Sequence, residues 1–445
     1  MMLAILLLCG CIGTTGSWSV SSEAKQQWDY VNVRPDAYMF WWLYHTTAPS
    51  PHTAPLVMWL QGGPGGSSTG FGNFEEIGPL TVQLKPRNTT WLSEASLLFV
   101  DNPVGTGYSY VTNSNAYTTD VKEIAQDLVI LFKAFLQRVP EFQTVPFYIF
   151  CESYGGKMVA AFSMELRKAI ESGEIKSDFR GAALGDSWIS PMDSVNTWGP
   201  YLYATSLVDR TGLKRIQAAA LKTQMLVDAG KWTEATNSWS VTEDIVEQTT
   251  NGVNFYNILQ WGSAERHTRA PHWGKLSPLE RLYHRHVSYM QADNLASLMN
   301  GPIRQKLGII PKNVTWGGQS GMVFTKQSGD FMKPVVDIVE SLIQNCSALG
   351  SCLDIVVYSG QLDLIVDTAG TEAWVEKLSI APEFDQGKRE PIRDPVSNEQ
   401  SAYVKQVKNF AFFWILDAGH MVPADNGNTA LEMLRMVIHK ERNTL

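Results

Sequence analysis

Six short apolar runs constrain the fold of this chain more than any other feature. Each is four to seven residues long, rich in Val, Ile, Leu and Phe without polar alternation, and ends in turn residues. Strands with this pattern are typical of parallel sheets that are covered on both faces. In chain order the runs lie in APLVMWLQGGPGG (54–66), ASLLFVDNPVGTG (95–107), VPFYIFCESYGG (145–156), FRGAALGDSW (179–188), LDIVVYSGQLD (353–363) and NFAFFWILDAGHMV (409–422).

Helical patterns lie between several of these runs. The segment 118–140 begins with Thr118-Thr119-Asp120 as candidate caps and ends at Pro140, and a second helical pattern covers 155–173. Strands that alternate with helices predict an α/β fold with a mostly parallel central sheet and helices on both faces.

Residues 191–300 interrupt the alternation. Segments 211–232 and 240–250 read as helices, whereas 262–286 reads as a loop. We therefore expect a helical cap inserted at 191–300, between a first part of the α/β core at 20–190 and a second part at 301–445.

The N-terminus and the overall charge bear on location and partners. Residues 1–19 hold an apolar run of about ten residues followed by small residues, which is typical of a signal peptide. No later run is long and apolar enough to predict a membrane helix. The formal net charge of −8 argues against a nucleic-acid partner, which usually needs a basic face.

The cysteines and sequons fit a secretory route. Without the signal peptide three cysteines remain, and Cys346 and Cys352 lie six residues apart, which predicts a small disulfide and leaves Cys151 free. Sequons for N-glycosylation occur at Asn88, Asn313 and Asn345. The expected destination is the secretory pathway, with secretion or the lysosomal lumen as the end point.

Three of the runs deliver candidate catalytic side chains where each strand ends. Ser153 follows 147–150, Asp363 follows 354–359 and His420 follows 410–416. Active sites of open α/β sheets gather at this edge, and serine, acid, histidine is the chain order of α/β-hydrolase triads. Serine needs a base to become a nucleophile, and a carboxylate orients that base.

Alternatives exist for two triad positions. Asp367 also follows the strand, but Asp363 is nearer to its end and is preferred. His439 lies in an amphipathic final helix, where a solvated histidine is expected. A metal site on His284 and His286 is not favoured, since no acidic or cysteine cluster joins them in the sequence, and no cofactor is expected.

Acyl transfer also needs hydrogen-bond donors for the developing oxyanion. The amide of Tyr154, directly after the nucleophile, is one candidate. The second is the amide of Gly63 in the loop QGGPGG that follows 56–60, because glycine exposes its amide without a side chain in the way.

These motifs resemble the serine carboxypeptidases, the family of carboxypeptidase Y and cathepsin A, over nearly the whole mature chain. They look most like its retinoid-inducible branch. The similar segments are WLQGGPGGSS, FVDNPVGTGYSY, CESYGGK, YSGQLDLIVDTAG and AGHMVPADN.

The resemblance implies the α/β-hydrolase fold and the triad Ser153, Asp363 and His420, with the Gly63 and Tyr154 amides as oxyanion hole. It also implies a site for the terminal carboxylate of the substrate. The positions that match the family's carboxylate-binding residues are Gln61, Gly62, Glu76 and Glu152, and Glu76 is chosen over Glu75 because EIG matches the family's E-x-G.

Five positions depart from the family pattern, although none belongs to the triad. Gln61 stands where the family has Asn, Gly66 where it has Cys, Cys151 where it has Gly, Lys157 where it has His and Gln361 where it has Asp. Gly66 therefore removes a family disulfide. These changes bear on efficiency and on the range of substrates.

The sequence thus predicts a serine carboxypeptidase that removes C-terminal residues from peptides and proteins through an acyl-enzyme. Binding should be favoured at acidic pH, because a protonated Glu76–Glu152 pair can donate to the substrate's carboxylate, and we expect affinity to weaken as pH rises through roughly 5 to 7. The alternatives are an acyltransferase on the same scaffold and a catalytically weak binding or protective partner. The sequence leaves open whether the chain forms a homodimer.

Overall fold

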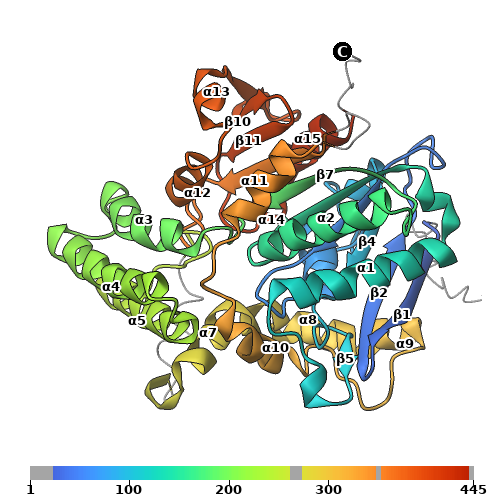
Figure 1. Cartoon of the computed structure of the whole chain (residues 1–445), viewed down its shortest axis with the longest axis horizontal. Coiled ribbons are helices and arrows are strands. Elements are labelled where there is room, and N and C mark those ends of the chain that lie inside the picture. Colours follow the sequence, from blue (N-terminus) through green and yellow to red (C-terminus); the bar gives the residue numbers. More distant parts are fainter. Residues whose placement is uncertain (1–23, 261–272, 347–351, 440–445) are drawn as a thin grey trace, which may run out of the picture.

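A computed structural model describes residues 24–260, 273–346 and 352–439. Its centre is an 11-stranded sheet with the order β1-β2-β4-β3-β6-β7-β8-β11-β10-β9, and β5 pairs with β2 (Figure 1). The inner ladders from β4 to β11 are parallel, and the ladders at both edges are antiparallel. The predicted signal peptide at 1–19 lies outside the described residues.

All six predicted runs are strands of this sheet. β3, β4 and β6 have almost no exposed residue, which explains why their sequences lack polar alternation. The strands are β1 (Gln26–Arg34), β2 (Ala37–Tyr44), β3 (Leu56–Leu60), β4 (Ser96–Val100), β5 (Tyr110–Val111), β6 (Pro146–Glu152), β7 (Asp178–Gly185), β8 (Asp354–Gly360), β9 (Arg389–Arg393), β10 (Gln400–Val407) and β11 (Phe410–Ile415).

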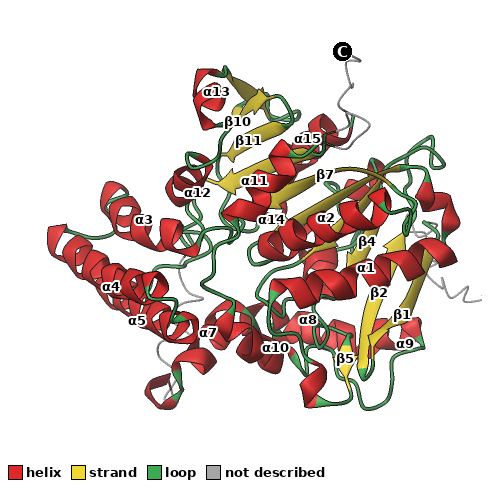
Figure 2. Cartoon of the chain, viewed as in Figure 1, coloured by secondary structure: helices red, strands yellow, loops and turns green. Residues whose placement is uncertain are grey.

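Helices flank the sheet and fill the connections (Figure 2). The α-helices are α1 (Val121–Arg138), α2 (Gly155–Glu171), α3 (Pro191–Ala204), α4 (Arg210–Asp228), α5 (Trp232–Thr250), α7 (Pro278–His286), α8 (Asp293–Leu298), α9 (Arg304–Leu307), α10 (Ser320–Lys326), α11 (Val336–Gln344), α12 (Thr368–Val375), α13 (Ala381–Gln386), α14 (Val422–Asp425) and α15 (Gly427–Ile438). None of the helices within the described ranges is long and apolar enough to cross a membrane.

The two helices predicted beside the nucleophile strand are confirmed. The Asp120 side chain caps α1 by accepting a hydrogen bond from the Glu123 amide. α1 and α2 lie side by side along the sheet (Figure 1). The expectation of an α/β fold with a mostly parallel sheet is therefore correct.

The segment between β7 and β8 carries the helices that depart from the alternation. α4 and α5 form an antiparallel pair that projects away from the sheet, on the left in Figure 1. α7 packs against α5. α5 and α7 matter for the site because each contributes one residue to its lining, Trp239 and His286.

The prediction of a loop over 262–286 is wrong at its C-terminal end, where α7 covers 278–286. Ser277 caps this helix, the Glu280 side chain bonds back to the Ser277 amide, and Pro278 occupies the first turn. The segment is rich in charged and polar residues, so its sequence shows no clear helical pattern of apolar residues. Residues 261–272 lie outside the described part of the chain.

The predicted thiol pairing is confirmed. Cys346 and Cys352 form a disulfide, and Cys151 is free and buried.

Candidate active site

Ser153 lies on a tight turn between β6 and α2. Its φ is +63°, in the left-handed region that non-glycine residues rarely adopt. A Cβ on Gly62 would lie 2.5 Å from the Cβ of Ser153, so glycine is needed for the β3 loop to approach the turn. The turn holds Ser153 half-buried while its neighbours Glu152 and Tyr154 are fully enclosed.

Cys151 occupies the strand end just before this turn. Its thiol is fully buried, lies 3.4 Å from the carbonyl oxygen of Ala183, and has a pKa raised to about 12 by burial. A small apolar side chain therefore fits the crowded position where the family has glycine.

Asp363 and His420 meet beyond the ends of β8 and β11. The Nδ1 of His420 lies 2.7 Å from Oδ2 of Asp363, and both side chains are buried. Within the described residues, Nε2 of His420 has no hydrogen-bond partner, and His420 lines the same pocket as Ser153. Burial lowers the pKa of His420 to about 4, so the ring is neutral and able to accept a proton above that pH.

The alternatives for the acid and the base occupy other positions. Asp367 caps α12 by accepting from the Gly370 amide at 2.9 Å and also accepts from the Thr197 hydroxyl at 2.7 Å. His439 lies exposed at the end of α15. The geometry therefore favours Asp363 and His420.

A second buried carboxyl, Asp186, adjoins the acid and was missed by the sequence analysis. It follows β7, accepts from the Gly360 amide at 2.8 Å, and lies close enough to Asp363 for that carboxyl to shift its pKa. Burial and the proximity of Asp363 raise the pKa of Asp186 well above its usual range. Because Asp363 must accept from His420, Asp186 is the acid of the two that is expected to hold a proton. The sequence could have indicated Asp186, because in GDSW it directly follows a predicted strand, as the triad candidates do.

Gln61 and Glu152 are joined close to the nucleophile. Gln61 accepts from the Trp59 indole at 2.7 Å and donates its amide to Oε1 of Glu152, also at 2.7 Å. The Trp59 contact fixes which end of the amide faces Glu152.

Glu76 completes this acidic group from the segment Ser68–Ile77. Burial raises the pKa of Glu76 to about 7, and burial together with the Glu76 charge raises that of Glu152 well above its usual range. With both carboxyls ionised, the buried oxygens of Glu76 would have no donor among the described residues. One proton between them would supply a Glu76–Glu152 hydrogen bond, and a second proton, which makes the pair neutral, would supply a donor for a bound anion. Neighbouring Glu75 is exposed.

The two candidate oxyanion donors are free to bind a ligand. Within the described chain, no hydrogen bond engages the amides of Gly63 and Tyr154. Gly63 has φ +112°, a backbone conformation that residues with a side chain rarely adopt.

One pocket brings most of these residues together. Ser153, His420, Gln61, Gly62, Gly63 and Glu152 line it. The remaining wall is largely aromatic and was not predicted, because its members come from distant segments. These residues are Trp188, Trp239, Tyr256, His286, Tyr289, Met290, Phe331 and Ile365. The described residues contain no group of three or more His, Cys, Asp or Glu side chains that could hold a metal.

Two other departures have clear structural partners. A Cβ at Gly66 would lie 2.7 Å from Cε of Met290, so the Met290 side chain occupies the space beside this glycine. Lys157 is completely buried, and its ammonium lies 2.8 Å from Oδ2 of Asp330. The Tyr154 hydroxyl also donates to Asp330, at 2.7 Å.

Comparisons with known proteins identify the family of the chain. Residues 17–440 match the family model described as serine carboxypeptidase. The chain is 53% identical to the retinoid-inducible serine carboxypeptidase of Mus musculus and 54% identical to that of Homo sapiens, in both cases over 99% of this chain and 97% of the relative. A prohormone-processing carboxypeptidase from Saccharomyces cerevisiae has a similar fold, with a TM-score of 0.76, 21% identity, and coverage of 93% of this chain and 91% of that one.

Proposed function

The chain belongs to the serine carboxypeptidase family, and we propose that Ser153, His420 and Asp363 carry its hydrolysis of C-terminal peptide bonds. The observation that supports this most directly is the buried contact of 2.7 Å between His420 and Asp363, with Ser153 and His420 lining the same pocket.

The chemistry follows from this arrangement. Nε2 of His420 takes the proton of the Ser153 hydroxyl as its oxygen attacks the scissile carbonyl, and Asp363 stabilises the imidazolium that forms. The amides of Gly63 and Tyr154 donate to the oxyanion. The protonated ring then gives its proton to the leaving amine, and water repeats the sequence to release the acyl group.

The acidic group beside the nucleophile gives the site its selectivity for chain ends. Gln61, the Gly62 amide, Glu76 and Glu152 receive the carboxylate of the last residue. A protonated carboxyl is neutral and can donate a hydrogen bond to the substrate's carboxylate, whereas two ionised glutamates would repel it. This requirement favours acidic to neutral pH.

The surroundings of the pocket fit a lumenal enzyme with a helical cap. Trp239, Tyr256 and His286 lie within 191–300, so this segment covers the pocket and would shape substrate choice. Asn88, Asn313 and Asn345 are all exposed and accessible to glycosylation. We propose passage through the secretory pathway, with a signal peptide at 1–19.

The test is a comparison of the purified chain with its Ser153→Ala variant on blocked dipeptides. The wild-type chain should release the last residue and react covalently with a fluorophosphonate, and the variant should do neither at a comparable rate, with a loss of several orders of magnitude. Trimming that persists in a well-folded Ser153→Ala protein would show that another group is the nucleophile. An added alcohol distinguishes hydrolysis from acyl transfer through the product formed.

A further inference from the structure

A second histidine–carboxylate pair lies in the wall of the active-site pocket. His286, the last residue of α7, places Nε2 at 2.8 Å from Oε1 of Glu243 on α5, and both side chains are buried. The imidazole also stacks on Trp239, with ring centroids 4.9 Å apart and planes inclined by 18°. Neither residue belongs to the proposed triad or to the carboxylate-binding group.

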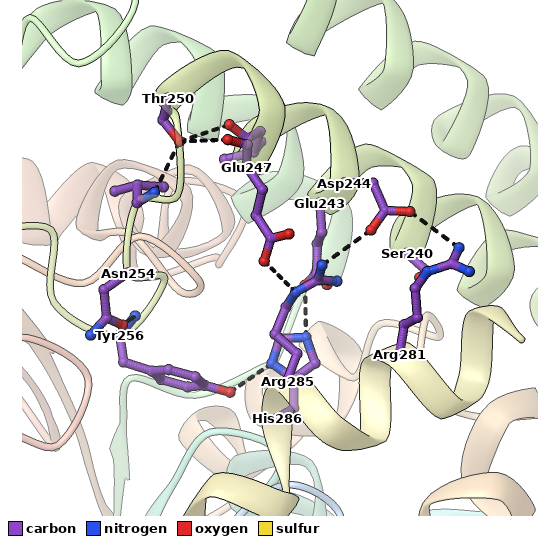
Figure 3. A network of polar contacts seen from close by, with 12 residues as sticks. Ser240, Glu243, Asp244, Glu247, Thr250, Asn254, Tyr256, Arg281, Arg285 and His286 are labelled. Carbon is purple, nitrogen blue, oxygen red and sulfur yellow. Dashed lines mark hydrogen bonds and ion pairs between the residues drawn. The ribbon is translucent and has the colours of Figure 1, made fainter. Parts of the chain in front are cut away.

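Arg285 forms ion pairs with Glu243 and two other carboxylates of α5. The guanidinium donates to Glu243 at 2.6 Å, to Glu247 at 2.9 Å and to Asp244 at 3.1 Å, as Figure 3 shows. A carboxylate paired in this way only accepts hydrogen bonds. The His286 contact with Glu243 therefore requires a proton on Nε2.

The other ring nitrogen then receives the hydroxyl of Tyr256. Burial lowers the pKa of His286, although the Glu243 charge opposes this, so the ring is neutral and Nδ1 is an acceptor. The Tyr256 oxygen lies 2.6 Å from Nδ1 and must donate to it (Figure 3). Arg285 and His420 are the other charged or titratable groups that act on His286, and both disfavour its protonation.

Tyr256 in turn contacts the catalytic histidine in two ways. Its carbonyl oxygen accepts from the His420 amide at 2.7 Å, and its ring lies against the His420 imidazole with centroids 5.0 Å apart. A Cβ on Gly419 would come within 2.1 Å of that same carbonyl oxygen, so the two segments are in direct backbone contact. Tyr256 thus supports one side of the imidazole, while Asp363 holds its Nδ1.

We propose that His286 is a positioning residue that fixes Tyr256, and through it the His420 ring, for proton transfer with Ser153. This role rests on the proposed function of His420 as the base. Histidine suits the position because one ring both stacks on Trp239 and presents a donor and an acceptor on opposite sides. The pair also links the cap helices α5 and α7 to the catalytic centre.

The substitutions His286→Phe and His286→Asn separate positioning from packing. Phe keeps a ring on Trp239 but cannot accept from Tyr256, whereas Asn carries an acceptor oxygen at about the place of Nδ1 and loses the stacking. We expect kcat about tenfold lower for His286→Phe, the usual effect of one lost hydrogen bond, with KM within about twofold. His286→Asn should melt at a lower temperature than His286→Phe and yet have the higher kcat.

Two further variants complete the experiment. Tyr256→Phe should lower kcat about as much as His286→Phe, and the double variant should show no additional loss, because both changes remove the same contact. The control is His284→Phe on the same helix, which should keep wild-type kcat.

Three results would overturn the proposal: wild-type kcat in His286→Phe, a kcat order that follows melting temperature, or additive losses in the double variant. The proposed function is tested separately. If His420→Ala retains full activity, the assignment of the base fails, whereas an inactive His420→Ala together with a fully active His286→Phe refutes only the positioning role.

Discussion

Replacing Glu76 by Gln should remove the pH dependence of substrate binding near neutrality. In the wild-type chain, burial raises the pKa of Glu76 to about 7, and that of its partner Glu152 lies well above the usual range. The pair is therefore neutral below about pH 7 and carries one negative charge just above it. Because the incoming carboxylate is itself negative, affinity should fall as pH rises through this pKa.

The size of the effect follows from the titration of one group. The neutral fraction of a group with a pKa of about 7 is roughly 0.9 at pH 6 and roughly 0.1 at pH 8, so KM for a peptide acid should rise about tenfold over that interval. In Glu76→Gln the amide donates at either pH, and the change should stay below about twofold. The structure thus places the pH range over which affinity falls near pH 7, the upper end of the range of roughly pH 5 to 7 that the sequence suggests.

The assay compares a blocked dipeptide with the matching dipeptide amide, used as a competitor, at constant ionic strength. The amide carries no terminal carboxylate, so its affinity should change little with pH in either protein. The matched control is Glu75→Gln, which alters the exposed neighbour; its charge contributes least among the causes that shift the pKa of Glu76, so the rise in KM should persist with only a small displacement along the pH axis. A tenfold rise in KM that persists in Glu76→Gln, or equal profiles for acid and amide in the wild-type chain, would refute the carboxylate-recognition argument.

Three other outcomes can be measured. Asp363→Asn should lower kcat by about 10⁴, whereas Asp367→Asn should act chiefly on stability through the cap of α12, and steady-state kinetics distinguish the two. Lys157→Met should lower the free energy of unfolding by about 3–5 kcal/mol in a urea titration, because it leaves a buried carboxylate without its cation. The exposed ion pair of Lys133 provides the contrast, and Lys133→Met should cost less than about 1 kcal/mol. The Cys151 thiol should resist alkylation in the folded chain and react on unfolding; rapid labelling of the native protein would contradict its burial.

The sequence by itself determined the six inner strands of the sheet, the chain order of the triad candidates and the disulfide, but not the antiparallel strands at the two edges of the sheet. Strands buried on both faces need continuous apolar residues, and each run ends at the turn that carries a candidate side chain, so Ser153, Asp363 and His420 could be identified from local patterns. The free thiol at Cys151 followed from counting cysteines.

Tertiary structure decided which distant groups surround these side chains. Asp186 became relevant only because β7 and β8 are neighbours in the sheet, which places its carboxyl against Asp363. The sequence places His286 in a polar segment and gives no sign of a role in the site. The packing of α7 against α5 brings it to Glu243, 43 residues away in the chain, and this contact suggests the positioning role. A local pattern fixes the conformation of its own segment, whereas contacts between segments depend on packing that no single stretch of sequence encodes.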